Sequence, residues 1–239
     1  MMESLPRFSK PHEPTSLSER AYLVVRSQIL KGELPLGASL SRRKLAKKLG
    51  MSLLPVAEAL QRLESDGLVE SRPRVGTRVY LPSAEDIREH YQVREALESQ
   101  AARLFAEKST QRERRELKKM ADRMDEMFTQ CLAEGSEVSR EFLYEVHDHH
   151  ARLHLRIAEC TGCRALRRTL EKNHVLIFTW LYDVAAQRPP LPQHFHSDLI
   201  EAISKGDPEE ADRAMRYHVR YGADNVVRGI FYHEQQQAV

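Results

Sequence analysis

Cysteine is scarce in this sequence: only three occur among 239 residues, at Cys131, Cys160 and Cys163. Three thiols are too few for a disulfide scaffold, and their odd number favours reduced side chains. Cys160 and Cys163 form a single CxxC, whereas a zinc ribbon needs a second pair and a thioredoxin-like motif needs a neighbouring βαβ pattern. We interpret this pair as thiols at a helix boundary, with redox sensing as the alternative.

Long apolar runs are also missing. The sequence has no stretch of about 18 apolar residues that could cross a bilayer, and its opening segment, MMESLPRFSKPHEP, lacks the apolar core of a signal peptide. The hydrophobic content of 41% and the charged content of 30% are ordinary for a soluble globular protein. We therefore expect a cytoplasmic chain that makes no membrane contact and is long enough for two domains.

Acidic residues are few in the N-terminal third. Residues 1–82 contain 8 Asp/Glu against 14 Lys/Arg, which leaves 27 acidic and 23 basic residues in the rest of the chain. A basic N-terminal part favours a polyanionic partner, because Lys and Arg side chains that neutralise phosphates release condensed counterions. The alternative is an ordinary solvated surface, since small domains often have such an excess.

The pattern of residues 18–82 is typical of a winged helix-turn-helix. A helix from Ser16 or Ser18 to about Lys31 is followed by a turn, ELPLGASL, and by a basic helix that Ser41 caps. After a glycine turn, apolar residues at i, i+4 and i+7 predict the buried face of a further helix, at Val56, Leu60 and Leu63. Two short strands, LVES and TRVYL, then flank the hairpin tip RPRVG. This arrangement places a helix in the major groove of DNA.

Only helical periodicity follows residue 82. We expect helices at residues 83–108, 110–133, 136–160, 163–186, 193–205 and 207–232. The predicted fold is therefore mainly α: an N-terminal winged helix-turn-helix followed by an all-helical bundle effector domain. Its parts are a flexible arm at 1–17, the DNA-binding domain at 18–82, and a helical domain at 83–235, to which the family resemblance given below assigns effector binding and dimerisation.

Four histidines are placed where the bundle would bring them together. His150 and His154 are four residues apart on one helix, with their roots about 6 Å apart, a spacing at which two imidazoles can share an ion. His196 begins a second helix and His218 lies inside a third, and the turn between those helices makes them antiparallel. The spacing indicates a metal site. The alternative is that the histidines are solvated polar residues near helix ends.

Several quoted segments resemble a known family. Residues 22–79, which include SRRKLAKKLGMSLLPVAEALQRLESDGLVE, resemble the DNA-binding domain of the GntR family of bacterial transcription regulators. The segments YQVREALESQAARLFAE, HARLHLRIAECTGC and HSDLIEAISKGDPEEADRAMRYHV resemble the all-helical FCD effector domain of its FadR-type branch. The resemblance covers about residues 18–225, with the motifs in the same order.

The resemblance implies a divalent metal site. Many effector domains of this branch hold a metal through an acidic residue four positions before a histidine and through two later histidines. In this chain His154, His196 and His218 match the three histidine places, and His150 stands where the pattern has aspartate. An all-imidazole site favours a divalent transition metal, zinc or nickel, over magnesium or calcium.

The resemblance also implies a small carboxylate effector and a homodimer. Arg94 matches an arginine common in the first helix of such effector domains, and we expect it to hold the anionic effector. The alternative is that Arg94 only pairs with Glu95 or Glu98. A homodimer would suit a two-fold symmetric double-stranded DNA operator.

The DNA-reading residues depart from the family. Family members usually carry arginine at the positions of Leu53 and Ala57, so two contacts are missing here. We expect phosphate contacts from Arg42, Arg43, Lys47, Arg72 and Arg74. We expect base contacts from Ser52, Leu53 and Gln61, with Leu53 against a thymine methyl group.

These observations together predict a DNA-binding transcription regulator, acting as a repressor, whose operator affinity responds to a small carboxylate at the metal site. One rival is a metal-dependent hydrolase with a histidine-lined site. It would need a general base beside His150 and His154, which we do not find, and it leaves the basic wing unexplained. A second rival is a regulator whose bundle only dimerises. We expect a regulator and not an enzyme.

Overall fold

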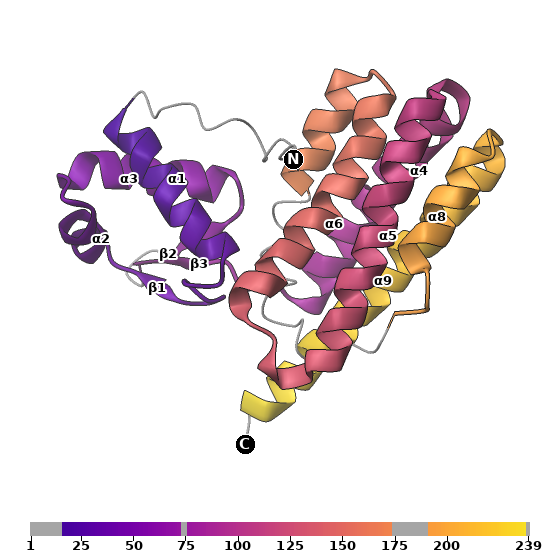
Figure 1. Ribbon diagram of the computed structural model, residues 1–239. Coiled ribbons are helices and arrows are strands. Elements are labelled where there is room, and N and C mark those ends of the chain that lie inside the picture. Colours follow the sequence, from indigo (N-terminus) through magenta and orange to yellow (C-terminus); the bar gives the residue numbers. More distant parts are fainter. Residues whose placement is uncertain (1–15, 73–75, 174–190, 238–239) are drawn as a thin grey trace, which may run out of the picture. The chain divides into compact units, whose positions relative to one another are not determined.

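The computed structural model describes residues 16–72, 76–173 and 191–237, and its elements are labelled in Figure 1. The chain divides into two compact units, Met1–Leu81 and Pro82–Val239. Nearly all of the expected arm at 1–17 lies outside the described residues. No helix in the described part of the chain combines the length and the apolar character needed to span a membrane.

The first unit consists of three helices and a small sheet. The helices are α1 (Leu17–Leu30), α2 (Arg42–Leu49) and α3 (Leu53–Ser65). The strands are β1 (Ser39–Leu40), β2 (Val69–Arg72) and β3 (Gly76–Val79), which pair antiparallel in the order β1-β3-β2. Two successive helices followed by a hairpin are the winged helix-turn-helix that the sequence predicts.

Local side chains explain where α1 and α2 begin. Ser16 Oγ accepts a hydrogen bond from the backbone N–H of Glu19, and Ser41 Oγ accepts one from Lys44, so that each serine caps the helix that follows it. Gly50, at φ 63° and ψ 37°, takes the left-handed conformation that closes the turn between α2 and α3. The tight turn fixes the direction in which α3 leaves α2.

The segment predicted as a turn, residues 33–40, ends in a short strand instead. Ser39 pairs with Arg78 and Leu40 with Thr77, and Leu40 is only 5% exposed. Two residues are too few to show the alternation by which strands are recognised in a sequence. The strand is therefore set by pairing with β3 and by burial of Leu40.

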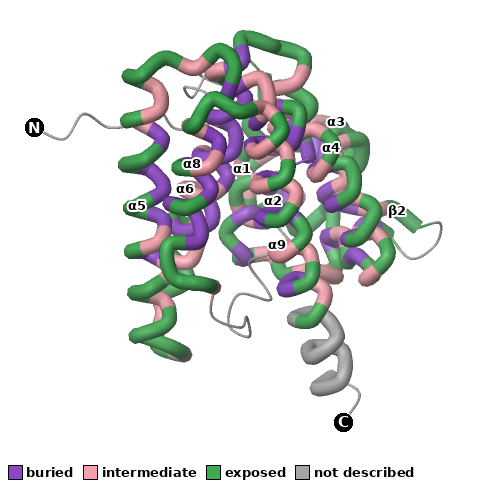
Figure 2. The backbone as a smooth tube through the Cα atoms, turned by 90° about the vertical axis from the view of Figure 1, so that its right-hand side faces the viewer, coloured by how far each residue is buried: buried purple, intermediate pink, exposed green. Residues whose placement is uncertain are grey.

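The core of the first unit lies between α1 and α3, which pack against each other. The predicted buried face of α3 is confirmed, because Val56, Leu60 and Leu63 are at most 3% exposed. Figure 2 colours each residue by its burial, and along the helices buried positions alternate with exposed ones. The hydroxyl of Tyr22 on α1 donates a hydrogen bond of 2.6 Å to the Asp66 carboxylate at the end of α3.

The second unit is a helical bundle. Its helices are α4 (Ala84–Lys108), α5 (Gln111–Glu134), α6 (Arg140–Cys160), α8 (Phe195–Ser204) and α9 (Pro208–Gln237). Residues 164–173 are also helical. Capping boxes begin the first two helices: Ser83 with Asp86 for α4, and Thr110 with Glu113 for α5. A mainly α protein with one small sheet is the predicted fold class.

Two predicted helices need correction. The helix expected over 136–160 begins only at Arg140, because Gly135–Glu137 forms a 3₁₀ turn and Ser139 caps the helix that follows. The helix expected over 193–205 begins at Phe195, after His194 in a left-handed conformation. Part of the helix expected over 163–186 lies outside the described residues.

The bundle brings separate segments of the chain together around α4. This helix packs against α9 and also contacts α6 and α8, while α5 packs against α6 and α8. The interior is mostly apolar, but it also contains buried polar side chains from four of these helices. Polar residues are seldom fully buried unless they are paired or functional. They mark the candidate site.

Candidate functional site

Four imidazoles converge inside the bundle, and we call His150, His154, His196 and His218 the histidine cluster. His150 and His154 come from α6, His196 from the first turn of α8, and His218 from α9. The ring centroid of His150 lies 4.6 Å from that of His154 and 5.1 Å from that of His196. The ring centroids of His218 and His154 are 5.1 Å apart. The structure therefore brings together all four histidines that the sequence singled out.

The nitrogen atoms of the cluster have the spacing of metal ligands. One nitrogen each from His150, His196 and His218 lies within 4.8 Å of the others. The Nε2 atoms of His150 and His154 are 3.1 Å apart. Two imidazole nitrogens that each lie ~2.0–2.1 Å from one zinc ion are separated by roughly 3 to 3.4 Å. His154 lies directly beside the three residues first named.

Asp125 of α5 fixes the orientation of His196. Its Oδ1 accepts hydrogen bonds from Nδ1 of His196, at 2.8 Å, and from the backbone N–H of the same residue, at 3.1 Å. Its Oδ2 accepts one from the backbone N–H of Ser197 at 3.0 Å. Burial tends to raise the pKa of this carboxyl, but the hydrogen bonds from His196 and Ser197 outweigh burial and lower it to about 2. Donation from Nδ1 leaves the lone pair of His196 on Nε2.

Glu98 of α4 holds His154 in a similar way. One of its oxygens contacts Nδ1 of His154, and the other accepts a hydrogen bond from the guanidinium of Arg94. Both Arg94 and Glu98 are almost fully buried, at 2% and 1% exposed. Carboxylates that hold the second ring nitrogen of a histidine are typical of metal-binding histidines, because they fix the tautomer and raise the basicity of the ligand.

The cluster favours neutral imidazoles. Burial, and then the neighbouring histidines and Arg94, hold the pKa values of His150 and His218 well below their usual range. Burial also lowers the pKa of His196, against the opposing effect of Asp125. Nδ1 of His218 is buried and has no hydrogen-bond partner, while the ring stacks on Phe195 at 4.4 Å. Neutral imidazoles with free lone pairs are the form that binds metal ions.

The predicted effector residue, Arg94, lies at the edge of the cluster. Its Nη2 is 3.4 Å from Nε2 of His154, and its guanidinium also lies over the ring of Tyr91. The alternative pairing with Glu98 is present, whereas Glu95 pairs with Arg216 and Arg220 of α9. Arg94 is thus placed both to pair with Glu98 and to donate into the space beside His154.

From the sequence, Glu98 was named only as an alternative partner of Arg94, and Asp125 was not identified. Glu98 was visible as one turn beyond Arg94 on the same helix, but Asp125 lies 71 residues from His196 and no spacing connects them. The other histidines of α6 take different roles. His149 hydrogen-bonds through Nε2 to the carbonyl of Met120 at 2.8 Å, and His147 is 3% exposed and outside the cluster.

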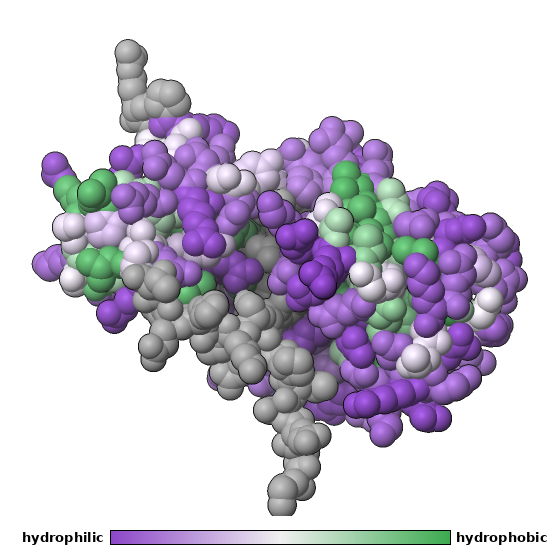
Figure 3. Space-filling view, turned by 90° about the horizontal axis from the view of Figure 1, so that it is seen from above, coloured by the Kyte–Doolittle hydropathy of each residue, from purple (hydrophilic) through white to green (hydrophobic). Residues whose placement is uncertain are grey.

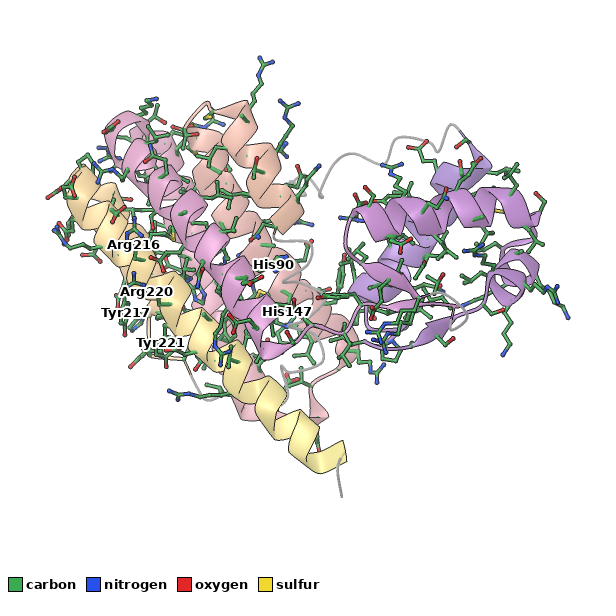
Figure 4. All side chains as sticks on the ribbon, turned by 180° about the vertical axis from the view of Figure 1, so that it is seen from behind. His90, His147, Arg216, Tyr217, Arg220 and Tyr221 are labelled. Carbon is green, nitrogen blue, oxygen red and sulfur yellow. The ribbon has the colours of Figure 1, made fainter. Side chains whose placement is uncertain are left out.

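A second hollow lies outside the cluster, along α9. It has a volume of about 380 Å³ and is lined by Arg213, Arg216, Tyr217, Arg220, Tyr221 and Asp224. Figure 4 shows Arg216, Tyr217, Arg220 and Tyr221 along the same helix. Glu95 accepts hydrogen bonds from both Arg216 and Arg220, and Asp212 accepts another from Arg216, so the charge of these two arginines is largely compensated within the bundle.

The residues expected at the DNA lie on the surface of the first unit. Exposed side chains include Arg42, Arg43, Lys47, Ser52 and Gln61, and Leu53 is 51% exposed. Arg72, at the end of β2, hydrogen-bonds to Glu70 at 3.1 Å, so part of its charge is already compensated. Arg74 lies outside the described residues. The expected contacts with DNA remain predictions.

The thiols of the CxxC differ in environment. Burial raises the pKa of Cys160 to about 12, with Glu113 adding to the rise and Arg156 opposing it. Cys163 is exposed, and both are free cysteines. A thiol with a raised pKa is a poor nucleophile near neutral pH, because the thiolate is the reactive form. This environment favours the interpretation of Cys160 as a thiol at a helix boundary over redox sensing.

Comparisons with known proteins agree with the resemblance seen in the sequence. Residues 89–221 match the FCD domain family, and residues 17–79 match the family described as bacterial regulatory proteins, gntR family. A relative from Paenarthrobacter nicotinovorans, named "Probable D-xylose utilization operon transcriptional repressor", is 32% identical over 222 residues, which cover 88% of this chain and 89% of the relative.

Two further proteins extend the comparison. The HTH-type transcriptional repressor RspR of Escherichia coli K12 is 24% identical over 220 residues, covering 90% of each chain. The solved structure of McbR/YncC from the same species superposes with a TM-score of 0.68 at 23% identity, covering 90% of this chain and 98% of that one. At this level of identity, the structural likeness concerns the fold alone.

Proposed function

Because the chain belongs to the GntR family of bacterial regulatory proteins and has an FCD domain, we propose that it is a repressor controlled through a metal centre. In this proposal a small carboxylate binds at a divalent ion in the histidine cluster and changes the affinity for a DNA operator. Members of this family regulate transcription by binding DNA and are not enzymes, so the hydrolase rival is set aside. Two relatives are named as repressors, which supports repression as the mode of action.

One observation carries the metal centre: four imidazoles meet, those of His154, His196 and His218 buried and that of His150 partly buried, and carboxylates hold the Nδ1 atoms of two of them. Asp125 holds His196, and Glu98 holds His154. The unpartnered Nδ1 of His218 is a further buried polar atom that an ion nearby would satisfy. Without an ion, four neutral imidazoles in an apolar interior are costly to bury. These residues therefore fit a metal ion, with His150, His154, His196 and His218 as its ligands.

The donor set selects the kind of metal. All four ligands are imidazoles, which suit zinc, nickel and other transition ions better than the hard ions magnesium and calcium. Because His150 stands in place of the family's aspartate, the site lacks a negatively charged ligand. When bound, the ion supplies positive charge and an open position at which an oxygen of a ligand can coordinate.

Charge favours an anionic effector. The charges of Arg94 and Glu98 offset each other, so a divalent ion among neutral imidazoles is balanced only by Asp125. A carboxylate would neutralise the remaining charge. Arg94 Nη2, beside His154, is placed to donate a hydrogen bond to the second oxygen of that carboxylate. The pairing of Arg94 with Glu98 holds the guanidinium in place for this contact.

We further propose that the chain acts as a homodimer through α4. The surface of the second unit includes bands of apolar residues, as the face seen in Figure 3 shows. On the outer side of α4, Val93 is 51% exposed, and Leu97, Gln100 and Leu104 continue from it at spacings of four, three and four. This is the spacing of a seam between two paired helices. Replacing Val93 with arginine is expected to reduce the mass measured in solution from dimer to monomer, whereas an unchanged mass would place the interface elsewhere.

The metal and effector steps are tested on protein purified without a histidine tag. Elemental analysis is expected to find one transition metal ion per chain, and the ion is expected to be lost from the His218→Ala variant. Small carboxylates titrated into a complex of the metal-loaded protein with operator DNA are expected to release the DNA. Protein without a stoichiometric metal would support the rival in which the bundle only dimerises. Metal binding without any response to carboxylates would overturn the effector step alone.

A further inference from the structure

The side of α3 on which Leu53 lies contains no cation. Along this face lie Leu53, Leu54, Ala57, Glu58 and Gln61. The single basic residue of α3, Arg62, is also exposed, but it lies about half a turn around the helix from Leu53, and its guanidinium lies 4.0 Å from the ring of Tyr22 on α1. Recognition helices commonly read guanine by an arginine or lysine that donates to both O6 and N7. This face of α3 has no side chain able to make that contact.

Two leucines occupy the place where such cations would be found. Leu54 is 68% exposed and Leu53 is 51% exposed, both in the first turn of α3. Other exposed leucines of this unit lie on α1 or after β3, but only these two lie on the recognition helix within the described residues. The N-terminal part of such a helix is the part that meets the base edges in the major groove. The leucines are therefore placed to meet bases, not phosphates.

The surroundings of the leucines identify duplex DNA as the surface that covers them. Arg42, Arg43 and Lys47 on the preceding helix are exposed and supply positive charge to the same unit. An apolar pair on a unit with exposed cations is complementary to a major groove, in which thymine methyl groups project between two rows of phosphates. An apolar protein partner would not require these cations.

We infer that α3 selects A·T base pairs, with Leu53 and Leu54 packed on thymine methyl groups and Gln61 hydrogen-bonded to adenine. A glutamine amide offers one donor and one acceptor, which match N7 and the N6 amino group of adenine. Gln61 is exposed two turns beyond Leu53 on the same side of the helix. Leu54 is a specificity residue in addition to those expected from the sequence. This inference rests on DNA binding by the family and is independent of the metal centre.

The test begins with selection of binding sites by the full-length chain from a pool of random-sequence duplexes. The enriched half-site is expected to contain A·T pairs at the positions that α3 contacts. The same duplex is then made with deoxyuridine in place of each thymidine of that half-site in turn, a change that removes only a methyl group. Affinity is expected to fall about threefold to fivefold for each contacted methyl, which corresponds to ~0.8 kcal/mol for one buried methyl-sized group.

Variants connect this loss to the leucines. Leu53→Ala and Leu54→Ala are each expected to remove the preference for thymidine over deoxyuridine at one position. The matched control is Leu132→Ala, a leucine of similar exposure, 54%, on α5 of the second unit, which is expected to keep the preference. Arg42→Ala is expected to weaken binding of both duplexes equally, because a phosphate contact does not sense the methyl group.

A gain of specificity completes the test. Leu53→Arg is expected to change the selected pair at one position from A·T to G·C, since arginine restores a donor pair for guanine. Equal affinity for thymidine and deoxyuridine duplexes, or an unchanged site selected by Leu53→Arg, would overturn the inference. Failure to enrich any duplex would be a different result, because it would contradict DNA binding itself.

Discussion

Replacing Asp125 with asparagine tests whether the histidine cluster is built for a metal ion. The change keeps the size of the side chain but removes the charge that faces Nδ1 of His196 at 2.8 Å. It also replaces one carboxylate oxygen by an amide NH₂ group, which cannot accept a hydrogen bond, so either His196 or Ser197 loses its acceptor. Nothing else in the contact needs to change.

The size of the effect follows from the role of the carboxylate. Loss of a group that orients a metal-binding histidine typically lowers metal affinity 10- to 100-fold, which is about 1.4–2.7 kcal/mol. We expect Asp125→Asn to fall in this range for zinc. The assay is a competition titration with a chromophoric chelator at pH 7, combined with circular dichroism to show that the bundle is still folded.

Asp122→Asn is the matched control. Asp122 lies one turn earlier on α5 and accepts a hydrogen bond from the hydroxyl of Ser197 at 2.7 Å, but it does not contact a histidine. Its replacement is expected to leave zinc affinity within about twofold, because a mainly exposed polar contact contributes little. Equal zinc affinity for the Asp125→Asn variant and the unmodified chain would refute the reasoning.

Four further outcomes are expected. The pKa of Asp125 is lowered to about 2, so its ionised form stabilises the fold above its unfolded pKa near 4, and this stability is lost as the pH falls through 2. Acid unfolding of the metal-free chain should therefore show that the Asp125→Asn variant is less stable than the unmodified chain by about 2 kcal/mol at pH 7. This difference in stability should shrink below pH 4. His150→Asp should weaken zinc relative to manganese, since it restores a hard oxygen ligand, and competition between the two ions measures the change. Arg72→Ala should lower the slope of log affinity against log salt by about 1 if the wing lies on a phosphate, and an unchanged slope would remove it from the interface. Burial and the hydrogen bond to Asp66 raise the pKa of Tyr22 to about 12, so its contribution to stability is complete below pH 10 and is lost as the pH rises through 12. Urea unfolding should therefore show that Tyr22→Phe lowers the free energy of unfolding by about 1 kcal/mol at pH 7, and by progressively less above pH 10.

Periodicity and capping signals predicted most of the fold. Ser16, Ser41, Ser83 and Thr110 each cap the helix that the sequence placed after them, because a cap is a local interaction between a side chain and the next turn. The strand β1 escaped prediction, since it consists of two residues held by pairing with β3. Its existence depends on the tertiary structure.

The residues of the candidate site were likewise predictable only in part. Spacing within α6 and the antiparallel turn between α8 and α9 were enough to bring the four histidines together in prediction. Neither spacing nor turn could identify Asp125, because α5 reaches His196 only through helix packing. Leu54 was missed for another reason: its position in the helix was known, but its exposure of 68% depends on what packs around α3. Ligands on one helix can be predicted from the sequence, whereas the groups that orient them come from the fold.

The affinity of the full-length chain for its selected duplex, with and without small carboxylates, tests most directly whether the histidine cluster controls DNA binding. Fluorescence anisotropy at one fixed salt concentration supplies the dissociation constants of the metal-loaded protein. An effector that couples the two sites is expected to weaken DNA binding at least about fivefold, and the His218→Ala variant is expected to lose this response while still binding the duplex. The same dissociation constant for metal-loaded, metal-stripped and carboxylate-treated protein would contradict the account.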